Sequence, residues 1–284
     1  MYPQTSLGQN SAHLTVLGAS GFIGSNLTNH LMRQGYSCSA PLRHDASIYT
    51  KPLGHIIYAI GLTADFRTRP LDTVEAHVCI LRKLLAEAEF ESLTYLSSAR
   101  FYRNAQSTSE QTSFSMNPHR VDSIYDLSKL MGESMCLHSG RNNIKIARLS
   151  NVIGLRNDCD MFIDQVLSDI VNKGSVLLKD AIGSSKDYIS IEDVSTILTQ
   201  LALSLETGCF NIASGENTSN LKILNFLKSK FSFDFLGSGI EEPTDLLPID
   251  ISRTQETFEF MPTSFDKFFP TYLDLFTKYR RITV

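Results

Sequence analysis

Tyr125 and Lys129 are four residues apart, and both side chains can take part in proton transfer. The apolar residues around them recur at helical spacing, and residues four apart lie on one face of a helix. A free phenol, with a pKa of about 10, transfers protons poorly at neutral pH, and a neighbouring ammonium favours its ionised form. The pair is therefore a candidate for general acid–base catalysis.

Two hydroxyl groups stand upstream of this pair, at the end of a mainly apolar run. The run Leu93–Leu96 predicts a strand, and Ser97 and Ser98 follow it directly. Ligands of an open parallel sheet bind at the carboxyl ends of its strands. The serines are therefore candidates for ligand contacts, unless they serve only to end the strand.

A glycine-rich turn lies where such a sheet would hold a phosphate. The run Leu14–Leu17 predicts a strand, and apolar residues at helical spacing follow the sequence Gly-Ala-Ser-Gly-Phe-Ile-Gly over 18–24. Glycines here permit a tight bend and close approach of a pyrophosphate, whose charge meets free N–H groups at the helix start. The turn predicts a dinucleotide site or, alternatively, a purely structural connection. The expected contacts are Gly18, Ser20, Gly21, Phe22, Ile23 and Gly24.

The next strand bears on which dinucleotide is bound. A strand near Ser37–Pro41 should end beside the adenosine ribose, where an acidic residue would bind the 2′-hydroxyl of NAD. Arg43 stands there instead, and its planar guanidinium suits a 2′-phosphate. We therefore expect NADP(H), with NAD(H) as the alternative, unless Arg43 is only a surface residue. A buried strand over 55–61 ends in Ile60 and Gly61, which we also assign to the cofactor.

The composition of the whole chain excludes several classes of protein. It has 284 residues, 42% of them apolar, and a formal charge of −4. Such a chain suits a large α/β domain, alone or with a smaller companion, and gives no electrostatic sign of nucleic-acid or membrane partners. Without an 18-residue apolar segment or a secretory signal, we expect a cytoplasmic protein. The widely spaced cysteines should be reduced core residues rather than metal ligands, namely Cys38, Cys79, Cys136, Cys159 and Cys209.

Five further phrases follow the glycine turn in a fixed order. They are LSSARFY from Leu96, YDLSKLMGE from Tyr125, RLSNVIG from Arg148, KDYISIEDV from Lys186 and CFNIASGE from Cys209. Over about residues 13–275 the chain resembles the extended branch of the short-chain dehydrogenase/reductase superfamily, which contains nucleotide-sugar epimerases, dehydratases and reductases. The resemblance implies an α/β fold, a doubly wound parallel sheet of the Rossmann type with a smaller C-terminal α/β substrate lobe.

The same resemblance implies a role for each candidate residue. Ser98, rather than Ser97, aligns with the catalytic serine, and Ser97 is expected at the cofactor. Tyr125 would be the general acid or base, and Lys129 would modulate it and hold the nicotinamide ribose, so that both touch the cofactor. The substrate contacts that it implies are Ser98, Arg100, Asn151 and Lys186.

The resemblance also implies two units and a paired assembly. Helices at about 71–88 and 123–138 commonly pair across a twofold axis in this family, so we expect a homodimer. The expected ranges are 1–12 for a flexible tail, 13–152 plus 186–206 for the cofactor domain, and 153–185 plus 212–284 for the substrate lobe.

Two departures from the family pattern affect the chemistry and the sheet. Sugar 4,6-dehydratases carry an Asp-Glu pair where this chain has Ala99 and Arg100, so dehydration is not expected. Eleven residues between Arg43 and His55 are too few for the usual helix and third strand. Either that strand or part of the cofactor affinity should therefore be missing.

A third departure concerns the diphosphate of the substrate. No second basic residue occurs over 239–247, which leaves Lys186 as the phosphate contact, with Arg253 or Arg156 as substitutes. Both arginines are equally well explained as surface groups. Asn151 is likewise either a substrate contact or a capping residue.

The function we expect is NADPH-dependent reduction of a 4-keto-6-deoxy nucleotide sugar in polysaccharide biosynthesis, because net reductases more often consume NADPH. A nucleotide-sugar 4-epimerase that recycles its NAD(P) is the alternative. A non-catalytic NADP-binding sensor is a third class, but it would be expected to lack Tyr125 or Lys129.

Overall fold

The computed structural model describes residues 12–155, 162–238, 242–243 and 246–282. Most of the tail predicted over 1–12 lies outside these ranges, as do Arg156 and Cys159. None of the helices in the described part of the chain has the length and apolar character needed to cross a membrane.

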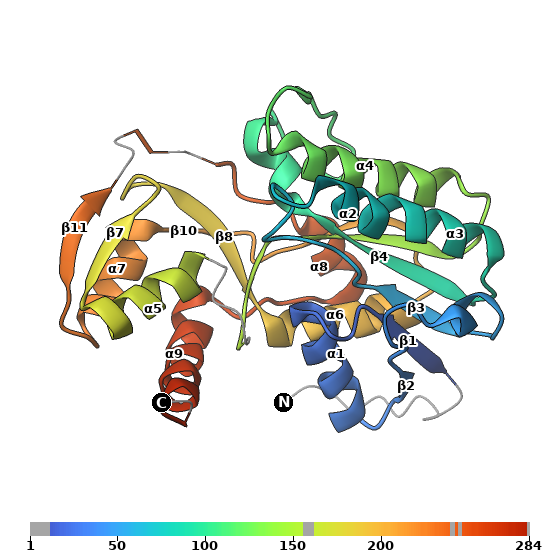
Figure 1. The fold of residues 1–284 in the computed structure, drawn as a ribbon, viewed down its shortest axis with the longest axis horizontal. Helices are drawn as coiled ribbons and strands as arrows, with labels where there is room; N and C mark the ends of the chain where they lie inside the picture. Colours follow the sequence, from blue (N-terminus) through green and yellow to red (C-terminus); the bar gives the residue numbers. More distant parts are fainter. Residues whose placement is uncertain (1–11, 156–161, 239–241, 244–245, 283–284) are drawn as a thin grey trace.

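A six-stranded sheet with only parallel neighbours forms the larger part of the molecule (Figure 1). Its middle strands are buried on both faces, although they carry several polar residues among the apolar ones. In spatial order the strands are β2 (Ser37–Ser39), β1 (His13–Leu17), β3 (His55–Tyr58), β4 (Ser92–Ser98), β5 (Ile144–Leu149) and β9 (Gly208–Ile212).

Helices cover both faces of this sheet (Figure 1). α1 (Phe22–Arg33) and α6 (Ile191–Leu203) pack against each other on one face, and α4 (Ser123–His138) packs on the other beside a second helical segment. That segment consists of α2 (Pro70–Val74), a π turn named η2 (Glu75–Cys79) and α3 (Ile80–Glu87). Helices on both faces of a parallel sheet confirm the predicted Rossmann-type fold.

The connection from β2 to β3 is short. It contains a 3₁₀ helix, η1 (Ala46–Tyr49), whose N-cap Asp45 accepts a hydrogen bond from the Ser47 N–H at 2.9 Å. β3 pairs with β1 on the side opposite to β2, so β2 is the last strand at this edge within the described residues. The chain therefore has no room for a further strand here, as its length predicted.

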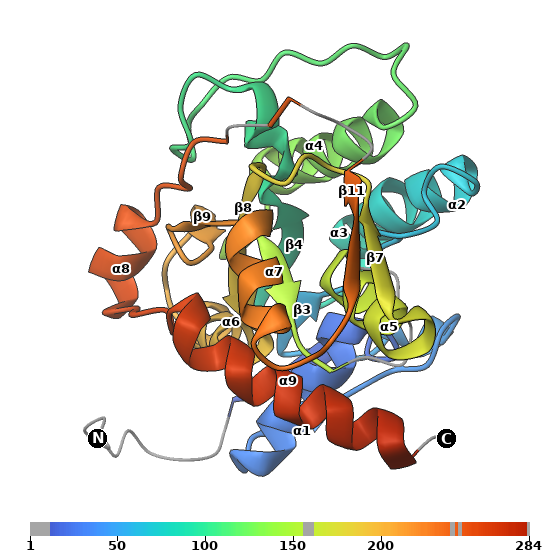
Figure 2. The same ribbon diagram turned by 90° about the vertical axis from the view of Figure 1, so that its left-hand side faces the viewer.

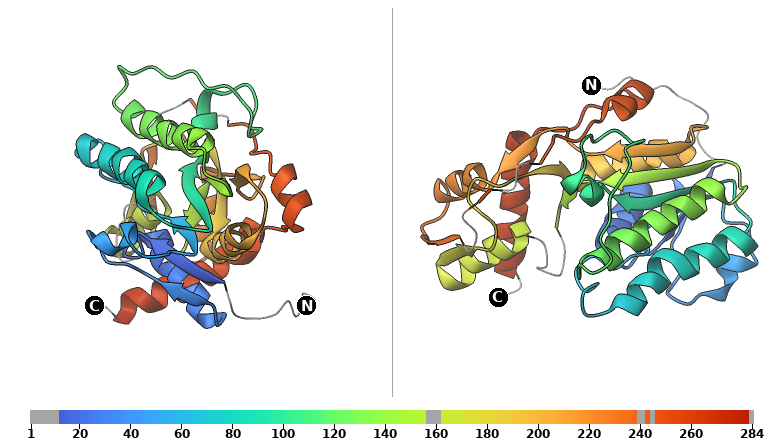
Figure 3. Two further views of the ribbon diagram at one scale, coloured as in Figure 1. Left: turned by 90° about the vertical axis from the view of Figure 1, so that its right-hand side faces the viewer. Right: turned by 90° about the horizontal axis from the view of Figure 1, so that it is seen from above.

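A smaller unit lies beside the main sheet, and the view from above separates the two (Figure 3). It has its own core, to which the last long helix contributes aromatic residues. Its elements are β6 (Asn151–Ile153), α5 (Phe162–Lys173), β7 (Ser175–Leu178), β8 (Ser185–Ser190), β10 (Asn217–Ser219), α7 (Asn220–Lys228), β11 (Asp234–Ser238) and α9 (Phe265–Ile282). Figure 2 shows the last long helix, α9, running along the lower side of the unit. β6 and β8 also contribute Val152 and Ile189 to the core of the larger unit. The unit resembles the predicted smaller α/β lobe, but most of β8 lies in the range 186–206 that the sequence assigned to the cofactor domain.

One C-terminal segment packs with the larger unit. α8 (Ser252–Phe258) contacts β9, and Phe258 and Phe260 join the core that contains α1 and α6. These residues lie in the range 212–284 that the sequence assigned to the substrate lobe. The chain thus returns to the main sheet before α9.

The cysteines that the structure describes are free thiols, but they differ in burial. Cys136 is buried, and Cys38 and Cys209 are half-buried. Cys79 is exposed at the end of the π turn, which corrects the expectation that it is a core residue. Apolar neighbours in the sequence do not determine which side of a helix a residue occupies.

Candidate active site

Ser98, Tyr125 and Lys129 come from two elements that meet at the carboxyl end of β4. Ser98 is the last residue of this strand, and α4, which carries the other two, packs across it. Tyr125 is buried. Burial raises the pKa of Tyr125, while the hydroxyl of Ser98 and the charge of Arg100, which favour the ionised phenol, oppose this rise.

Lys129 is buried one turn along α4 from Tyr125. Its Nζ donates a hydrogen bond to the Leu96 carbonyl oxygen at 2.7 Å and lies 5.0 Å from the centroid of the Tyr95 ring. Burial lowers the pKa of Lys129 to about 7. A Cβ atom on Gly61 would lie 3.4 Å from Nζ, so the ammonium also faces the loop after β3.

Arg100 lies against the ring of Tyr125. Its Cζ is 5.5 Å from the centroid of that ring and 5.2 Å from the centroid of the Phe66 ring. Its guanidinium contacts two carboxylates, at 2.6 Å from Asp122 Oδ2 and 3.2 Å from Asp126 Oδ1. The predicted substrate contact is therefore an ion-paired side chain that faces the predicted catalytic phenol.

His77, which the sequence analysis did not single out, lies at the centre of this site. Its ring is fully buried and meets the Tyr125 ring edge-on, with the centroids 5.3 Å apart. Nδ1 is 2.8 Å from Ser128 Oγ, and Nε2 accepts a hydrogen bond from the Leu62 N–H at 3.3 Å. Burial, and secondarily the charge of Lys129, lowers the pKa of His77 to about 2, so the ring is neutral.

The hydrogen bonds of His77 fix its tautomer. The Ser128 hydroxyl donates its hydrogen to the Tyr125 carbonyl oxygen at 3.0 Å, so Nδ1 of His77 must carry the hydrogen between it and Ser128. Nε2 is then the acceptor for Leu62. One clue was available in the sequence, because His77 is four residues before Leu81 on the helix face that was predicted to be buried.

The glycine turn adopts the conformation that its sequence predicted. Gly18 has a φ of +91°, and a Cβ atom there would lie 2.7–2.8 Å from the backbone of Ala59 and Ile60. A Cβ atom on Gly24 would lie 2.3 Å from the Gly18 carbonyl oxygen. Side chains at these positions would separate β1, α1 and the end of β3, which meet here.

The first turn of α1 fits a bound pyrophosphate. Gly21, the N-cap, provides no side-chain hydrogen bond, and the first turn contains no acidic residue. Its N–H groups are thus available to an anion. Of the other predicted contacts, Ser20 is exposed, and Phe22 and Ile23 are half-buried against the main core.

Ser97 points into a buried ion-pair network. Its hydroxyl donates a hydrogen bond to Glu133 Oε1 at 2.5 Å. Arg148 binds the same carboxylate through two bonds, at 3.0 Å from Nε to Oε1 and 2.7 Å from Nη2 to Oε2. Arg148 also donates to the Tyr102 hydroxyl at 2.8 Å. The hydroxyl of Ser97, which was expected to bind the cofactor, thus holds α4 against β4 and β5.

The remaining arginine candidates differ in their surroundings. Arg43 is exposed in the turn after β2. Arg253 donates to the carbonyl oxygens of Cys209 and Thr207, both at 2.9 Å, and its Cζ lies 4.1 Å from the centroid of the Phe210 ring. Arg253 therefore fastens α8 to β9, which accounts for it without a phosphate contact.

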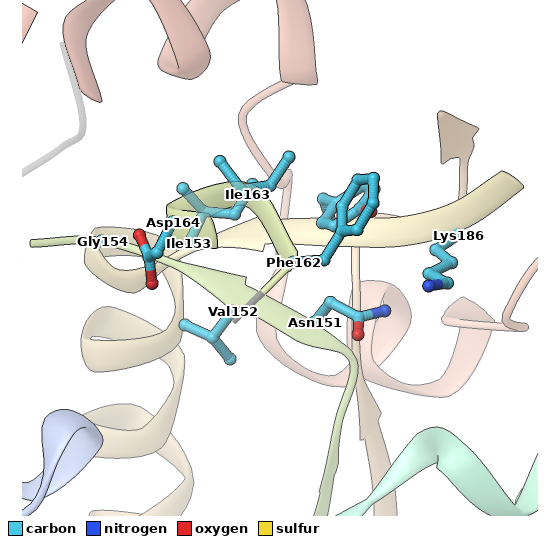
Figure 4. A pocket seen from close by; sticks show the side chains of 9 residues that line it. Asn151, Val152, Ile153, Gly154, Phe162, Ile163, Asp164 and Lys186 are labelled. Carbon is cyan, nitrogen blue, oxygen red and sulfur yellow. The ribbon is translucent and has the colours of Figure 1, made fainter. Parts of the chain in front are cut away.

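Asn151 and Lys186 line one cavity of about 70 Å³ between β6, β8 and α5 (Figure 4). Asn151 donates a hydrogen bond to the Asp187 carbonyl oxygen at 2.8 Å, and Lys186 Nζ lies 2.6 Å from Asp180 Oδ2. The buried Tyr188 hydroxyl has no hydrogen-bond partner in the described part of the chain. The lining residues are Asn151, Val152, Ile153, Gly154, Phe162, Ile163, Asp164, Lys186 and Tyr188.

Comparisons with known proteins identify the family and the fold of the chain. A family model described as the NAD dependent epimerase/dehydratase family matches residues 45–213. No curated protein matches the chain significantly.

Solved structures share the fold at low sequence identity. MoeE5, in complex with UDP-glucose and NAD, is 18% identical with a TM-score of 0.74, over 89% of this chain and 94% of that one. RMD from Pseudomonas aeruginosa, complexed with NADPH, is 19% identical with a TM-score of 0.72 over the same shares of the two chains, 89% and 94%. UDP-glucuronic acid 4-epimerase from Bacillus cereus, with UDP-glucuronic acid and NAD, is 19% identical with a TM-score of 0.72, over 89% of this chain and 94% of that one.

Proposed function

Because the chain belongs to the NAD-dependent epimerase/dehydratase family, we propose that it is an NADPH-dependent reductase of a 4-keto-6-deoxy nucleotide sugar. The observation that carries the proposal is the meeting of Ser98, at the end of β4, with Tyr125 and Lys129 on α4, which packs across that strand. Ala99 and Arg100 stand where sugar 4,6-dehydratases carry an Asp-Glu pair, and Arg100 lies beside the phenol, which disfavours dehydration.

In this reaction the residues of the chain place the carbonyl group and supply the proton. The bound nicotinamide supplies the hydride for the carbonyl carbon. Tyr125 donates its proton to the carbonyl oxygen, and Ser98 donates a hydrogen bond to the same oxygen. Lys129 binds the nicotinamide ribose, and solvent returns the proton to Tyr125.

The two ends of the site bind the two phosphorylated ligands. The open N-terminus of α1 receives the cofactor pyrophosphate, and Arg43 pairs with the 2′-phosphate. Lys186 exchanges its contact with Asp180 for the diphosphate of the nucleotide sugar, while Asn151 contacts the substrate in the same cavity.

The test is to follow NADPH absorbance with the purified chain and a panel of 4-keto-6-deoxy nucleotide sugars. We expect stoichiometric NADPH oxidation and a product with a hydroxyl group at C4. Absence of NADPH oxidation with every keto-sugar, from a folded protein that binds NADPH, would contradict the proposal.

A 4-epimerase is the second candidate, supported by the family match and by the similarity to a UDP-glucuronic acid 4-epimerase. The same Ser98, Tyr125 and Lys129 would then remove a proton from the C4 hydroxyl and later return it. An epimerase interconverts the two C4 sugars with no net consumption of NADPH. Product analysis by NMR separates the two functions.

The cofactor preference is tested at Arg43. Arg43→Ala should weaken NADPH binding by about 1–3 kcal/mol and leave NADH binding nearly unchanged, because only NADPH has a 2′-phosphate. Titration of each cofactor by calorimetry measures both affinities. Equal weakening of the two would show that Arg43 does not bind the 2′-phosphate.

A homodimer through α4 is part of the proposal. This helix buries several polar residues and exposes apolar ones, with Leu127, Met131 and Leu137 exposed by 39%, 54% and 54%. An apolar outer face of this kind is typical of a surface that another molecule covers. Light scattering should give twice the mass of a single chain, and the Met131→Glu variant should have the mass of a single chain.

A further inference from the structure

Arg100 is fixed beside the phenol of Tyr125 by contacts on several sides. Asp122 and Asp126 bind its guanidinium from α4, and the ring of Phe66 lies beneath it together with that of Tyr125. The side chain of Arg100 is only 19% exposed, so water screens its charge less than at an open surface.

The ammonium of Lys129, in contrast, contacts groups other than Tyr125. It donates to the Leu96 carbonyl oxygen and lies over Tyr95, and its pKa of about 7 leaves it only partly charged at neutral pH. The cation that lowers the pKa of Tyr125 in this structure is Arg100. An arginine keeps its charge at every pH at which the protein is folded.

We propose that Arg100 is a positioning residue that stabilises the ionised form of Tyr125 and thereby sets the pH range in which this residue transfers protons. Asp122 and Asp126 hold the guanidinium in place for this task. The inference rests on the proposed function for its kinetic consequence, but not for the ionisation of Tyr125 itself.

Other charged or titratable groups face Tyr125 from the surrounding elements. Asp126 on α4 raises its pKa, and the neutral His77 packs against its ring from the π turn. Three further groups stand around Arg100 and its two carboxylates and can modify its effect: Arg67, Arg103 and Arg120. Arg103, in the same 3₁₀ helix as Arg100, provides a matched control because its Nη1 lies 3.9 Å from Asp122.

The first test reads the ionisation of Tyr125 without any substrate. Tyrosines labelled with ¹³C at Cζ give ten signals, and Tyr125→Phe identifies the one from Tyr125. In Arg100→Gln this signal should titrate at higher pH than in the wild type, and Arg100→Lys should restore most of the difference. Arg103→Gln, with the same loss of charge, should change it much less.

The second test uses the pH dependence of turnover with NADPH and a keto-sugar. Arg100→Gln should reduce kcat about tenfold at neutral pH and move the limb of the profile that belongs to Tyr125 to higher pH, with KM nearly unchanged. Arg100→Lys should restore both. Thermal unfolding verifies that each variant is folded.

The outcomes separate this inference from the proposed function. An unchanged Tyr125 titration and pH profile in folded Arg100→Gln would overturn it, as would an equal shift in Arg103→Gln. A rise in KM with an unchanged profile would show that Arg100 binds the substrate instead. If no keto-sugar is turned over, the proposed reductase fails, while the NMR titration still decides the role of Arg100.

Discussion

Two regions differ in how their polar groups are paired: the catalytic end of the main sheet, by which we mean the candidate site of Ser98, Tyr125 and Lys129, and the cavity beside α5. Tyr125, Lys129 and His77 each have a protein partner in the absence of any ligand. Two buried polar atoms of this region, Arg100 Nε and Asp126 Oδ1, lack a hydrogen bond within the described part of the chain, but they face each other in an ion pair at 3.2 Å. Among the residues that line the cavity, Tyr188 has a buried hydroxyl with no partner of either kind among the described residues. The groups of the first region are thus held by the protein itself, whereas the second leaves one hydroxyl for a ligand to satisfy.

This difference suits the two tasks. Proton transfer requires groups held within a narrow geometry before the substrate arrives, and buried hydrogen bonds provide this. Recognition of a nucleotide sugar gains affinity from groups that lack partners in the free protein. Substitutions in the first region should therefore reduce stability or turnover, and those in the second should reduce binding alone.

The largest expected effect is the loss of stability when the buried ion pair between Arg148 and Glu133 of α4 is broken. Arg148→Met leaves the Glu133 carboxylate buried without its cation and should lower the free energy of unfolding by about 3–5 kcal/mol. The control, Lys222→Met, breaks an exposed pair with Asp266 and should cost less than about 1 kcal/mol. Equal costs in urea unfolding would show that the network does not stabilise the catalytic end.

The second prediction separates the chemistry from the scaffold. Tyr125→Phe should reduce kcat by a factor of about 10² or more, because a positioned proton donor is lost. NADPH binding should be nearly intact, since the contacts proposed for the cofactor phosphates lie on other elements. Steady-state kinetics and fluorescence titration of NADPH measure the two quantities. A variant as active as the wild type would contradict the assigned role of Tyr125.

The third prediction concerns the neutral His77, which lies between the loop after β3 and α4. The pKa of His77 is lowered from 6.5 to about 2, so below pH 6.5 only the unfolded chain gains this proton and stability falls. Between pH 6.5 and 5 the loss should be about 1.6 kcal/mol, because the slope rises from half of about 1.36 kcal/mol per pH unit at pH 6.5 towards its full value. His77→Asn should remove this part of the pH dependence, as urea unfolding at the two pH values can measure. An unchanged slope would show that the ring is not held neutral.

Local sequence predicted the parts of the site that are built from neighbouring residues. The glycine turn, the strand ending at Ser98 and the helix carrying Tyr125 and Lys129 each follow from spacing within a few residues. Even there the buried face of the helix could not be predicted, because α4 buries polar residues and exposes Leu127 and Met131.

Contacts between distant segments could not be predicted from the sequence. His77 meets Ser128 across 51 positions, and Ser97 meets Glu133 across 36. Helix and strand periods predict contacts only between residues that are close in the sequence. Whether residues this far apart meet depends on the path of the chain between them. The π turn that carries His77 is likewise a local departure from the helical spacing used to predict that helix.

The smallest effect is expected in the cavity, and it tests the comparison most directly. Tyr188→Phe removes a buried hydroxyl that has no partner in the described structure, so the free energy of unfolding should rise by about 1 kcal/mol or stay unchanged. If a substrate group satisfies this hydroxyl, KM for the nucleotide sugar should rise about threefold to tenfold while kcat is retained, since one hydrogen bond contributes about 0.5–1.5 kcal/mol. Tyr95→Phe is the control, because the Tyr95 hydroxyl already donates to the His77 carbonyl oxygen at 3.3 Å, and its loss should reduce stability without the gain expected at Tyr188. A Tyr188→Phe protein that is less stable and binds substrate as well as the wild type would show that this hydroxyl serves the fold, and the contrast between the two regions would then disappear.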